Sequence, residues 1–227
     1  MSFKAVFFDR DNTLLTGNPE IRVKKQAMIE NWSGRPFREL SYEEMMALFE
    51  KAGYPQEGHK SVESELAFWP QYYRELLAWA GVTEDLENRA RELFEATWLK
   101  NIKLFPETVE VLEYFKSRSY RMGVISDTSP SLPLTLEAAG IGHYFGCAIC
   151  SDLVGCEKPD PRIYQAALAA LGVRAGESLY VDDYDVEADG ARAMGFTAFH
   201  IDRSRPGDGK WRINSLRALV EFVEKNN

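Results

Sequence analysis

The sequence predicts an α/β protein with a doubly wound parallel sheet and one all-helical insertion, and two observations lead to this fold class. First, short apolar runs recur along the chain, and helical patterns separate most of them. Second, residues 17–100 contain helical patterns but no convincing strand. A chain of 227 residues is long enough for such a core domain with a sizeable insert.

The first predicted strand, residues 4–8, is a continuous apolar run that leads directly into an aspartate. Such runs are typical of central parallel strands that are buried on both faces. Four further runs have the same character and are predicted as strands: residues 121–126, 146–150, 178–181 and 196–201. The clearest helix begins after Asp160, because this residue can cap it, Pro161 fits its first position and Gly172 can end it.

The insertion contains many aromatic residues that need a packing partner. Its helical patterns cover residues 41–53, 63–81 and 83–100, and four of the five tryptophans lie in it. Aromatic residues at helical spacing usually form a bundle core, and contact of a subset with a substrate stays open as an alternative. We assign residues 1–16 and 101–227 to a sheet domain and residues 17–100 to a helical domain. A helical insert held by two adjacent connections could close over a site as a lid.

Composition limits the classes of partner. The net charge is −8 and no cluster of Lys and Arg exceeds a few residues, so the charge pattern of nucleic-acid binding is missing. The N-terminal apolar residues form no run long enough for a signal peptide or a membrane span. We therefore expect a cytoplasmic protein without a nucleic-acid or membrane partner, present as a monomer or a homodimer.

The three cysteines, Cys147, Cys150 and Cys156, are an odd number in a chain without an export signal, which argues against a disulfide framework. A zinc site formed by Cys147 and Cys150, with His143 or Cys156 as further ligands, is also disfavoured. Cys147 and Cys150 lie three residues apart on a predicted strand, so they would face opposite sides of the sheet. Structural zinc needs four converging ligands. We expect core thiols.

Polar residues follow the predicted strands at their carboxyl ends or in the next loop. They are Asp9 and Asp11, then Ser126 with Asp127 and Thr128, then Lys158, and finally Asp182 with Asp183. In a parallel sheet these ends lie along one edge, which is where ligands of open α/β sheets bind. We expect the side chains to converge on one pocket.

The chemistry of these residue types points to phosphate. Asp9, Asp11 and Asp182 supply hard anionic oxygens, which suit Mg²⁺ better than any softer metal. Lys158 adds a positive charge, and the Ser126 hydroxyl is a hydrogen-bond donor. These groups are the parts needed to hold a phosphoryl group and to stabilise the charge that is transferred with it. A carboxylate nucleophile would divide hydrolysis into the formation and breakdown of an aspartyl phosphate.

The order of FDRDNTLL, ISD, KPDP and VDDYDVEADGARAMG resembles the four motifs of the haloacid dehalogenase (HAD) superfamily. The resemblance extends from residue 5 to about residue 200, and the helical insertion lies where this family has its C1-type α-helical cap. It implies a Rossmann-like core, made of residues 1–16 and 101–227, with a cap domain at residues 17–100.

The resemblance also implies catalytic roles. Asp9 would be the nucleophile, and Asp11 would be the general acid for the leaving oxygen and then the base for the attacking water. Ser126 and Asp127 belong to the phosphate-binding set, with Ser126 donating to the phosphoryl oxygens. Lys158 would neutralise the nucleophile and the phosphate.

For the metal site, the resemblance implies Mg²⁺ bound by the side chains of Asp9 and Asp182 and by the backbone carbonyl of Asp11. Asp183 would orient Lys158 or a metal-bound water. Glu187 is a weaker candidate for the second acid of the last motif.

The chain departs from the family pattern at Asn12, where glycine is usual. Asparagine tolerates left-handed backbone conformations better than most residues, so the turn can persist. In the last motif, Asp185 and Asp189 are expected to be surface acids of a helix.

Asp11 favours phosphate over halide chemistry, because a leaving alkoxide needs a proton and a halide does not. True dehalogenases that resemble this chain carry a non-acidic residue there. We therefore expect a phosphatase for a small phosphorylated metabolite, with a sugar phosphomutase, a phosphonatase or a catalytically silent HAD-fold protein as alternatives. A CheY-type receiver domain is disfavoured by the motif order. In the insertion, Arg22, Lys24 and Arg35 are candidates for contacting an anionic substrate.

Overall fold

The computed structural model describes residues 3–226, which divide into two compact units. The larger unit contains residues 3–16, 103–128 and 132–226. The smaller unit contains residues 17–102 and the short segment 129–131. None of the helices within residues 3–226 is both long enough and apolar enough to pass through a bilayer.

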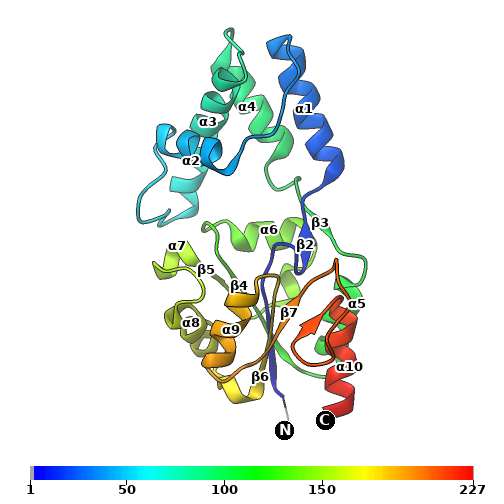
Figure 1. The fold of residues 1–227 in the computed structure, drawn as a ribbon. Coiled ribbons are helices and arrows are strands. Elements are labelled where there is room, and N and C mark those ends of the chain that lie inside the picture. Colours follow the sequence, from blue (N-terminus) through cyan, green and yellow to red (C-terminus); the bar gives the residue numbers. More distant parts are fainter. Residues whose placement is uncertain (1–2, 227) are drawn as a thin grey trace. The chain divides into compact units, whose positions relative to one another are not determined.

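The larger unit is built on a six-stranded parallel sheet with the order β5-β4-β1-β6-β7-β8 (Figure 1). The strands are β1 (Ala5–Phe8), β4 (Arg121–Ser126), β5 (Cys147–Cys150), β6 (Ser178–Asp182), β7 (Thr197–Ile201) and β8 (Arg212–Ile213). Strand β1 is central, and its last residue, Phe8, is in register with Val124 of β4 and Val181 of β6. The chain continues outward from β1 in both directions, so the predicted doubly wound parallel sheet is confirmed. The short strand β8 was not predicted.

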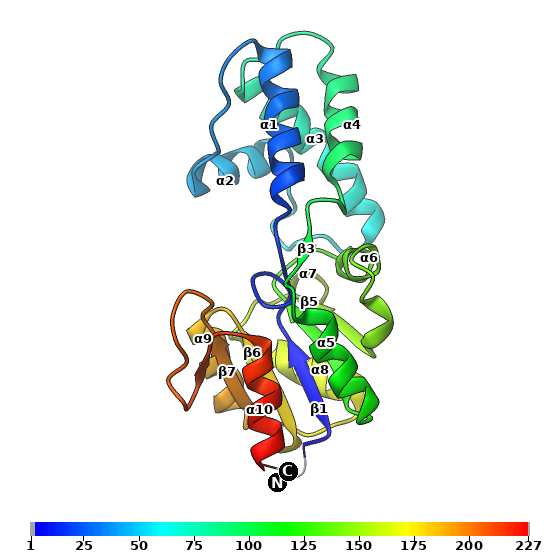
Figure 2. The same ribbon diagram turned by 90° about the vertical axis from the view of Figure 1, so that its right-hand side faces the viewer.

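Helices cover both faces of this sheet (Figure 2). The helices of this unit are α5 (Thr108–Ser117), α6 (Leu132–Ala138), α7 (Ser151–Val154), α8 (Pro161–Leu171), α9 (Asp185–Ala193) and α10 (Leu216–Asn226), with single 3₁₀ turns at Gly142–Tyr144 and Ala175–Glu177. Side chains of β1 point alternately to the two faces of the sheet. Phe8 packs in the core with α5 and α10, whereas Phe7 packs in the core with α8. Cys150 lies in the first core and Cys147 in the second, so these thiols face opposite sides as predicted.

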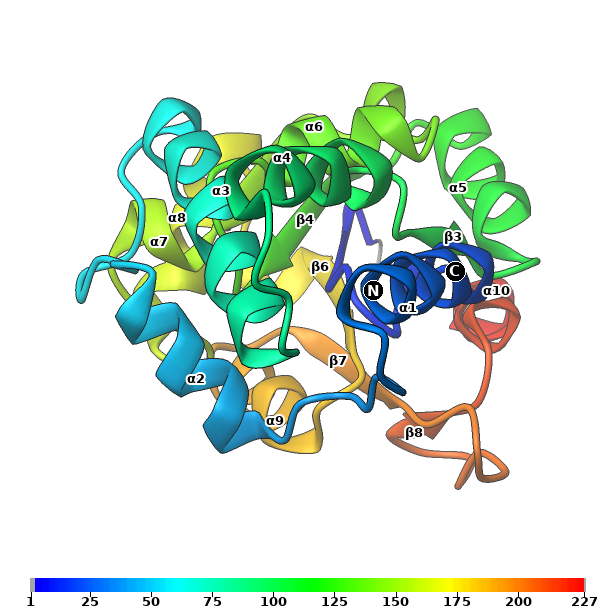
Figure 3. The same ribbon diagram turned by 90° about the horizontal axis from the view of Figure 1, so that it is seen from above.

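The smaller unit consists of α1 (Pro19–Ser33), α2 (Tyr42–Lys51), α3 (Val62–Trp79) and α4 (Leu86–Thr97). Helices α3 and α4 pack side by side (Figure 3), and aromatic side chains of α3 form much of the buried core, as the helical spacing predicted. The sequence analysis did not single out α1, although Asn18 caps it and Pro19 occupies its first turn.

Two short strands connect this part of the chain to the sheet. Strand β2 (Leu15–Thr16) pairs antiparallel with β3 (Lys103–Leu104), and Leu15 is in register with Leu104. The two connections on either side of the insertion therefore form one hydrogen-bonded ladder next to the carboxyl end of β1.

Candidate active site

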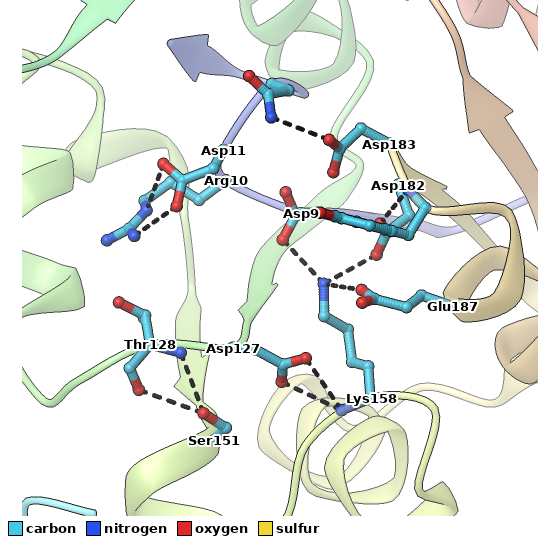
Figure 4. A network of polar contacts seen from close by, with 12 residues as sticks. Asp9, Arg10, Asp11, Asp127, Thr128, Ser151, Lys158, Asp182, Asp183 and Glu187 are labelled. Carbon is cyan, nitrogen blue, oxygen red and sulfur yellow. Dashed lines mark hydrogen bonds and ion pairs between the residues drawn. The ribbon is translucent and has the colours of Figure 1, made fainter. Parts of the chain in front are cut away.

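Seven of the candidate residues line one cavity of about 220 Å³ at the carboxyl ends of β1, β4 and β6. The cavity is lined by Asp9, Asp11, Asn12, Ser126, Asp127, Lys158, Asp183, Tyr184 and Glu187. Figure 4 shows the carboxylates of this edge gathered around the lysine. The convergence follows from the parallel strand order, because β4 and β6 flank β1 and all three strands end at the same edge.

Asp9 lies directly after β1, and its backbone N–H donates to the carbonyl of Val181 on β6 at 2.8 Å. Its side chain is buried and accepts from Lys158 Nζ at 2.8 Å. Burial raises the pKa of Asp9 to about 7, and the nearby Asp182 charge adds to the rise while Lys158 opposes it. The carboxylate therefore needs positive charge nearby to be fully ionised at neutral pH.

Lys158 supplies part of that charge and is itself almost completely buried. Its ammonium forms ion pairs with Asp9 and Asp182 at 2.8 Å each and with Glu187 at 2.6 Å. Burial alone would lower the pKa of Lys158, but these carboxylates more than offset it and hold the pKa well above its ordinary value. The Lys158 backbone N–H donates to the Asp127 carboxylate at 3.1 Å, which fixes the start of the loop that carries the lysine.

Glu187 lies in the first turn of α9, and burial raises its pKa to about 8. Asp183 was expected to orient Lys158 or a metal-bound water, with Glu187 as the weaker candidate for the second acid of the last motif. The structure places Glu187 against the lysine, whereas the Asp183 carboxylate accepts from Asn12 Nδ2 at 3.0 Å. Asp185 and Asp189 form ion pairs with Arg192, as expected for surface acids of this helix.

Three carboxylates lie close enough together to hold a divalent cation, those of Asp9, Asp182 and Asp183. Each offers one carboxylate oxygen, and these atoms all lie within 4.8 Å of one another. Carboxylate oxygens are the ligands that Mg²⁺ prefers. The side chain of Asp11 is not part of this group and is directed toward Arg10.

The Asp182 carboxylate is fully buried and is held by three donors. One oxygen accepts from Lys158 Nζ at 2.8 Å and from the Tyr180 hydroxyl, and the other accepts from the Tyr184 backbone N–H at 2.9 Å. Tyr180 precedes Asp182 by two residues on β6, so both side chains point to the same face of the sheet. The spacing of two residues between Tyr180 and Asp182 on a predicted strand is the sequence signal that would have indicated this contact.

The turn after Asp9 adopts the backbone conformation that the sequence required. Asn12 has φ +54°, in the left-handed region, so the expectation for this departure from glycine is confirmed. Arg203 holds the turn from the β7 side, because its guanidinium donates to the carbonyls of Asn12 at 3.1 Å and Thr13 at 2.8 Å. The same guanidinium donates to Glu107 Oε1 at 2.5 Å. No signal in the sequence indicated this contact.

Asp11 makes a two-point contact with its neighbour Arg10. Arg10 Nε donates to Oδ1 at 3.1 Å and Nη2 donates to Oδ2 at 2.6 Å (Figure 4). The Asp11 side chain is 55% exposed, whereas that of Arg10 is 15% exposed. The acid thus reaches solvent at the cavity while the guanidinium is largely covered.

The loop that contains Lys158 packs closely against α9 where Pro159 meets Gly190. A first side-chain carbon at Gly190 would lie 2.5 Å from Cβ of Pro159 and 3.2 Å from the Tyr164 hydroxyl. Because carbon atoms do not approach so closely, the missing side chain at Gly190 is what allows the loop to lie against the helix. The Tyr164 hydroxyl in turn donates to the backbone carbonyl of Glu187 at 2.7 Å.

The three basic candidates of the insertion belong to the helical unit. Arg22 forms an ion pair with Glu39 at 2.6 Å, Arg35 lies against Gly81, and Lys24 is exposed. Their expected contact with substrate stays a prediction.

Comparisons with known proteins agree with this fold. A family model described as haloacid dehalogenase-like hydrolase matches residues 3–195. The chain is 32% identical to a phosphoserine phosphatase of Thermus thermophilus over an alignment of 250 positions, which covers 95% of this chain and 97% of that protein. It is 31% identical to an (S)-2-haloacid dehalogenase of a Pseudomonas species over 147 residues, which cover 62% and 63% of the two chains.

Among solved structures, a HAD phosphatase from Thermococcus onnurineus superimposes with a TM-score of 0.65 at 26% identity, covering 97% of this chain and 98% of that chain. The match to the family model includes the segments that carry Asp9, Ser126, Lys158 and Asp182. The resemblance identified from the four motifs is therefore confirmed, and the chain belongs to the haloacid dehalogenase-like hydrolase family.

Proposed function

We propose that this protein is a Mg²⁺-dependent phosphatase that hydrolyses a small phosphorylated metabolite through an aspartyl phosphate on Asp9. The observation that carries the proposal is the pairing of two acids with separate environments in one cavity. Asp9 is buried against Lys158, as suits a nucleophile, and Asp11 is partly exposed, as suits a group that exchanges protons. The phosphatases among the relatives support the same substrate class.

In the proposed reaction, an Asp9 oxygen attacks phosphorus while the bond from phosphorus to the ester oxygen breaks. Asp11 gives a proton to the departing oxygen. Lys158 balances the negative charge of Asp9 and the phosphate, and the Ser126 hydroxyl donates to a phosphoryl oxygen. Asp11, now ionised, takes a proton from water, which attacks the aspartyl phosphate, releases phosphate and restores Asp9.

The carboxylates of Asp9, Asp182 and Asp183 would hold Mg²⁺. When bound, this ion supplies positive charge that favours the ionised nucleophile and neutralises phosphoryl oxygens. It would also relieve the elevated pKa of Asp9, because a cation next to a carboxylate favours its charged form.

Asp11 also favours one of the two activities named among the relatives, phosphate ester hydrolysis over dehalogenation. Because a halide leaves without a proton, an acid at this position is useful only when the leaving group is an oxygen. We propose phosphate ester hydrolysis for this reason, with the helical unit as a C1-type cap and with Arg22, Lys24 and Arg35 as candidates for contacting an anionic substrate.

The test is a hydrolysis assay of the full-length protein on p-nitrophenyl phosphate and a panel of phosphorylated metabolites, with Mg²⁺ and with a chelator. We expect Mg²⁺-dependent phosphate release, abolished in Asp9→Asn and lowered about 10²-fold or more in Asp11→Asn on alkyl phosphates. Acid-quenched samples should carry one phosphoryl group on Asp9 by mass spectrometry. Activity on 2-haloacids without activity on any phosphate ester would refute the proposal.

A further inference from the structure

We propose that Arg10 is a positioning residue that holds the Asp11 carboxyl group in the orientation from which it transfers a proton to the leaving oxygen. This inference rests on the proposed function. The four motifs assign no role to Arg10, which lies between the two aspartates. In the proposed reaction Arg10 does not attack phosphorus, and it is not one of the side chains that contact Lys158.

The geometry of the contact restricts the acid to one plane. Arg10 meets both Asp11 oxygens, at 3.1 Å and 2.6 Å, in the parallel two-bond arrangement that a guanidinium and a carboxylate favour. An aspartate that is 55% exposed would otherwise move between rotamers in solvent. The two bonds therefore select one orientation of a side chain that burial does not hold.

Arg10 is itself firmly placed. Only 15% of its side chain is exposed, and its guanidinium forms an ion pair with Asp11. The Arg10 backbone carbonyl accepts from the N–H groups of Leu14 at 3.0 Å and Leu15 at 3.1 Å, which closes the turn and connects it to β2. An arginine whose side chain is mostly covered and whose backbone is held in the turn is suited to orient a more exposed neighbour.

The contact leaves part of the Asp11 carboxyl group open. A carboxylate has about four lone-pair sites, so two bonds to Arg10 leave others for a contact with the leaving group. Asp11 lines the same cavity as Asp9 while it is bonded to Arg10. When the ester bond breaks, the proton moves from Asp11 to the departing oxygen, and the resulting carboxylate faces the positive charge of Arg10.

A comparison of two leaving groups distinguishes the positioning of Asp11 by Arg10 from a general contribution of Arg10 to the stability of the site. p-Nitrophenolate leaves readily without a proton, whereas phenolate of the same shape leaves poorly and depends more on the acid. The parameter to compare is kcat/KM, because it reports the step in which the leaving group departs and does not include the later hydrolysis of the aspartyl phosphate. We expect Arg10→Gln to lower kcat/KM about 10-fold for phenyl phosphate and less than about 3-fold for p-nitrophenyl phosphate.

The double variant tests whether Arg10 acts through Asp11. If it does, Arg10→Gln should add less than about 2-fold to the loss already caused by Asp11→Asn. The matched control is Arg217→Gln, which removes a surface guanidinium that contacts both oxygens of Glu110, and it should leave both kcat/KM values unchanged. Arg10→Lys, which keeps the charge but not the planar pair of donors, should show an intermediate leaving-group dependence and serves if Arg10→Gln does not fold.

Equal losses on the two esters in Arg10→Gln, or an undiminished loss in the Asp11→Asn background, would overturn the inference. A rise in KM for both esters without a change in their ratio would also overturn it, because Arg10 would then bind the phosphate directly. These results are distinct from failure of the proposed function, in which Asp11→Asn itself would show no dependence on the leaving group.

Discussion

Arg203 offers the most direct test of how the turn with Asp11 is held. Arg203→Met keeps an apolar stem next to the ring of Phe105 but removes the bonds to the carbonyls of Asn12 and Thr13 and to Glu107. A hydrogen bond to a neutral partner contributes about 0.5–1.5 kcal/mol and one between charged partners about 1.5–3 kcal/mol. Arg203 is 23% exposed, so water replaces part of what is lost. We expect the unfolding free energy to fall by about 3 kcal/mol.

The loss should depend on pH in a defined direction. Burial would raise the pKa of Glu107, but the hydrogen bond and charge of Arg203 outweigh it, so the pKa lies below the ordinary value of 4.5. A carboxyl group with a lowered pKa in the folded state stabilises the protein above the unfolded-state pKa, and this stabilisation is lost as the pH falls through the folded-state pKa. In Arg203→Met this contribution is lost, because burial is then opposed only by the backbone N–H groups of Glu107 and Leu216. The difference in unfolding free energy between the variant and the unchanged protein should therefore be largest at neutral pH and should shrink as the pH falls toward 3.

The assay combines urea unfolding between pH 7 and pH 3 with hydrogen–deuterium exchange of the peptide that contains residues 10–14. Faster exchange in this peptide would report loosening of the turn itself, apart from any global effect. Arg205→Met is the control, because this neighbouring arginine pairs with Asp202 at the surface with a side chain that is 69% exposed. An unchanged urea midpoint together with unchanged exchange in Arg203→Met would refute the reasoning.

Two further predictions concern the residues around the carboxylates. Tyr180→Phe removes a donor to Asp182 and should weaken Mg²⁺ binding about 10-fold, measured by calorimetry without substrate; unchanged affinity would mean that Lys158 and the Tyr184 backbone N–H position Asp182 without it. Asn12→Ala and Asn12→Gly both lose the side-chain bond to the Asp183 carboxylate, so their difference isolates the backbone. Because φ is +54° there, the alanine variant should be about 1 kcal/mol less stable than the glycine variant in urea unfolding, and equal stabilities would count against a left-handed turn.

Five of the six strands in the described sheet were predictable because each is a short, mostly apolar run, whereas β8 has only two residues and no such pattern. The residues after β1, β4 and β6 converge because parallel strands end at one edge, so a list of strand ends was enough to name Asp9, Ser126 and Asp182. The helix α8 was equally clear, since Asp160, Pro161 and Gly172 occupy the capping positions in the structure as the sequence suggested.

Contacts between distant side chains and backbone groups were not predictable in the same way. Arg203 bonds to the carbonyls of Asn12 and Thr13 across about 190 residues, and no periodicity or capping rule records such a contact. Which acid of the last motif contacts Lys158 depends on the residue at which α9 begins. Because the helix begins at Asp185, Glu187 lies in its first turn, and its side chain meets Lys158.

Gly190 has a consequence for how relatives of this protein are compared. It has no functional group, yet the position of Pro159, and with it that of Lys158, depends on the space that it leaves. A relative could retain all of the acids and the lysine and still hold the ammonium out of reach of Asp9 if a larger residue replaced this glycine. Surveys that infer activity from the polar residues alone would count such a chain as an intact enzyme, so the small residue on α9 belongs among the positions that such surveys inspect.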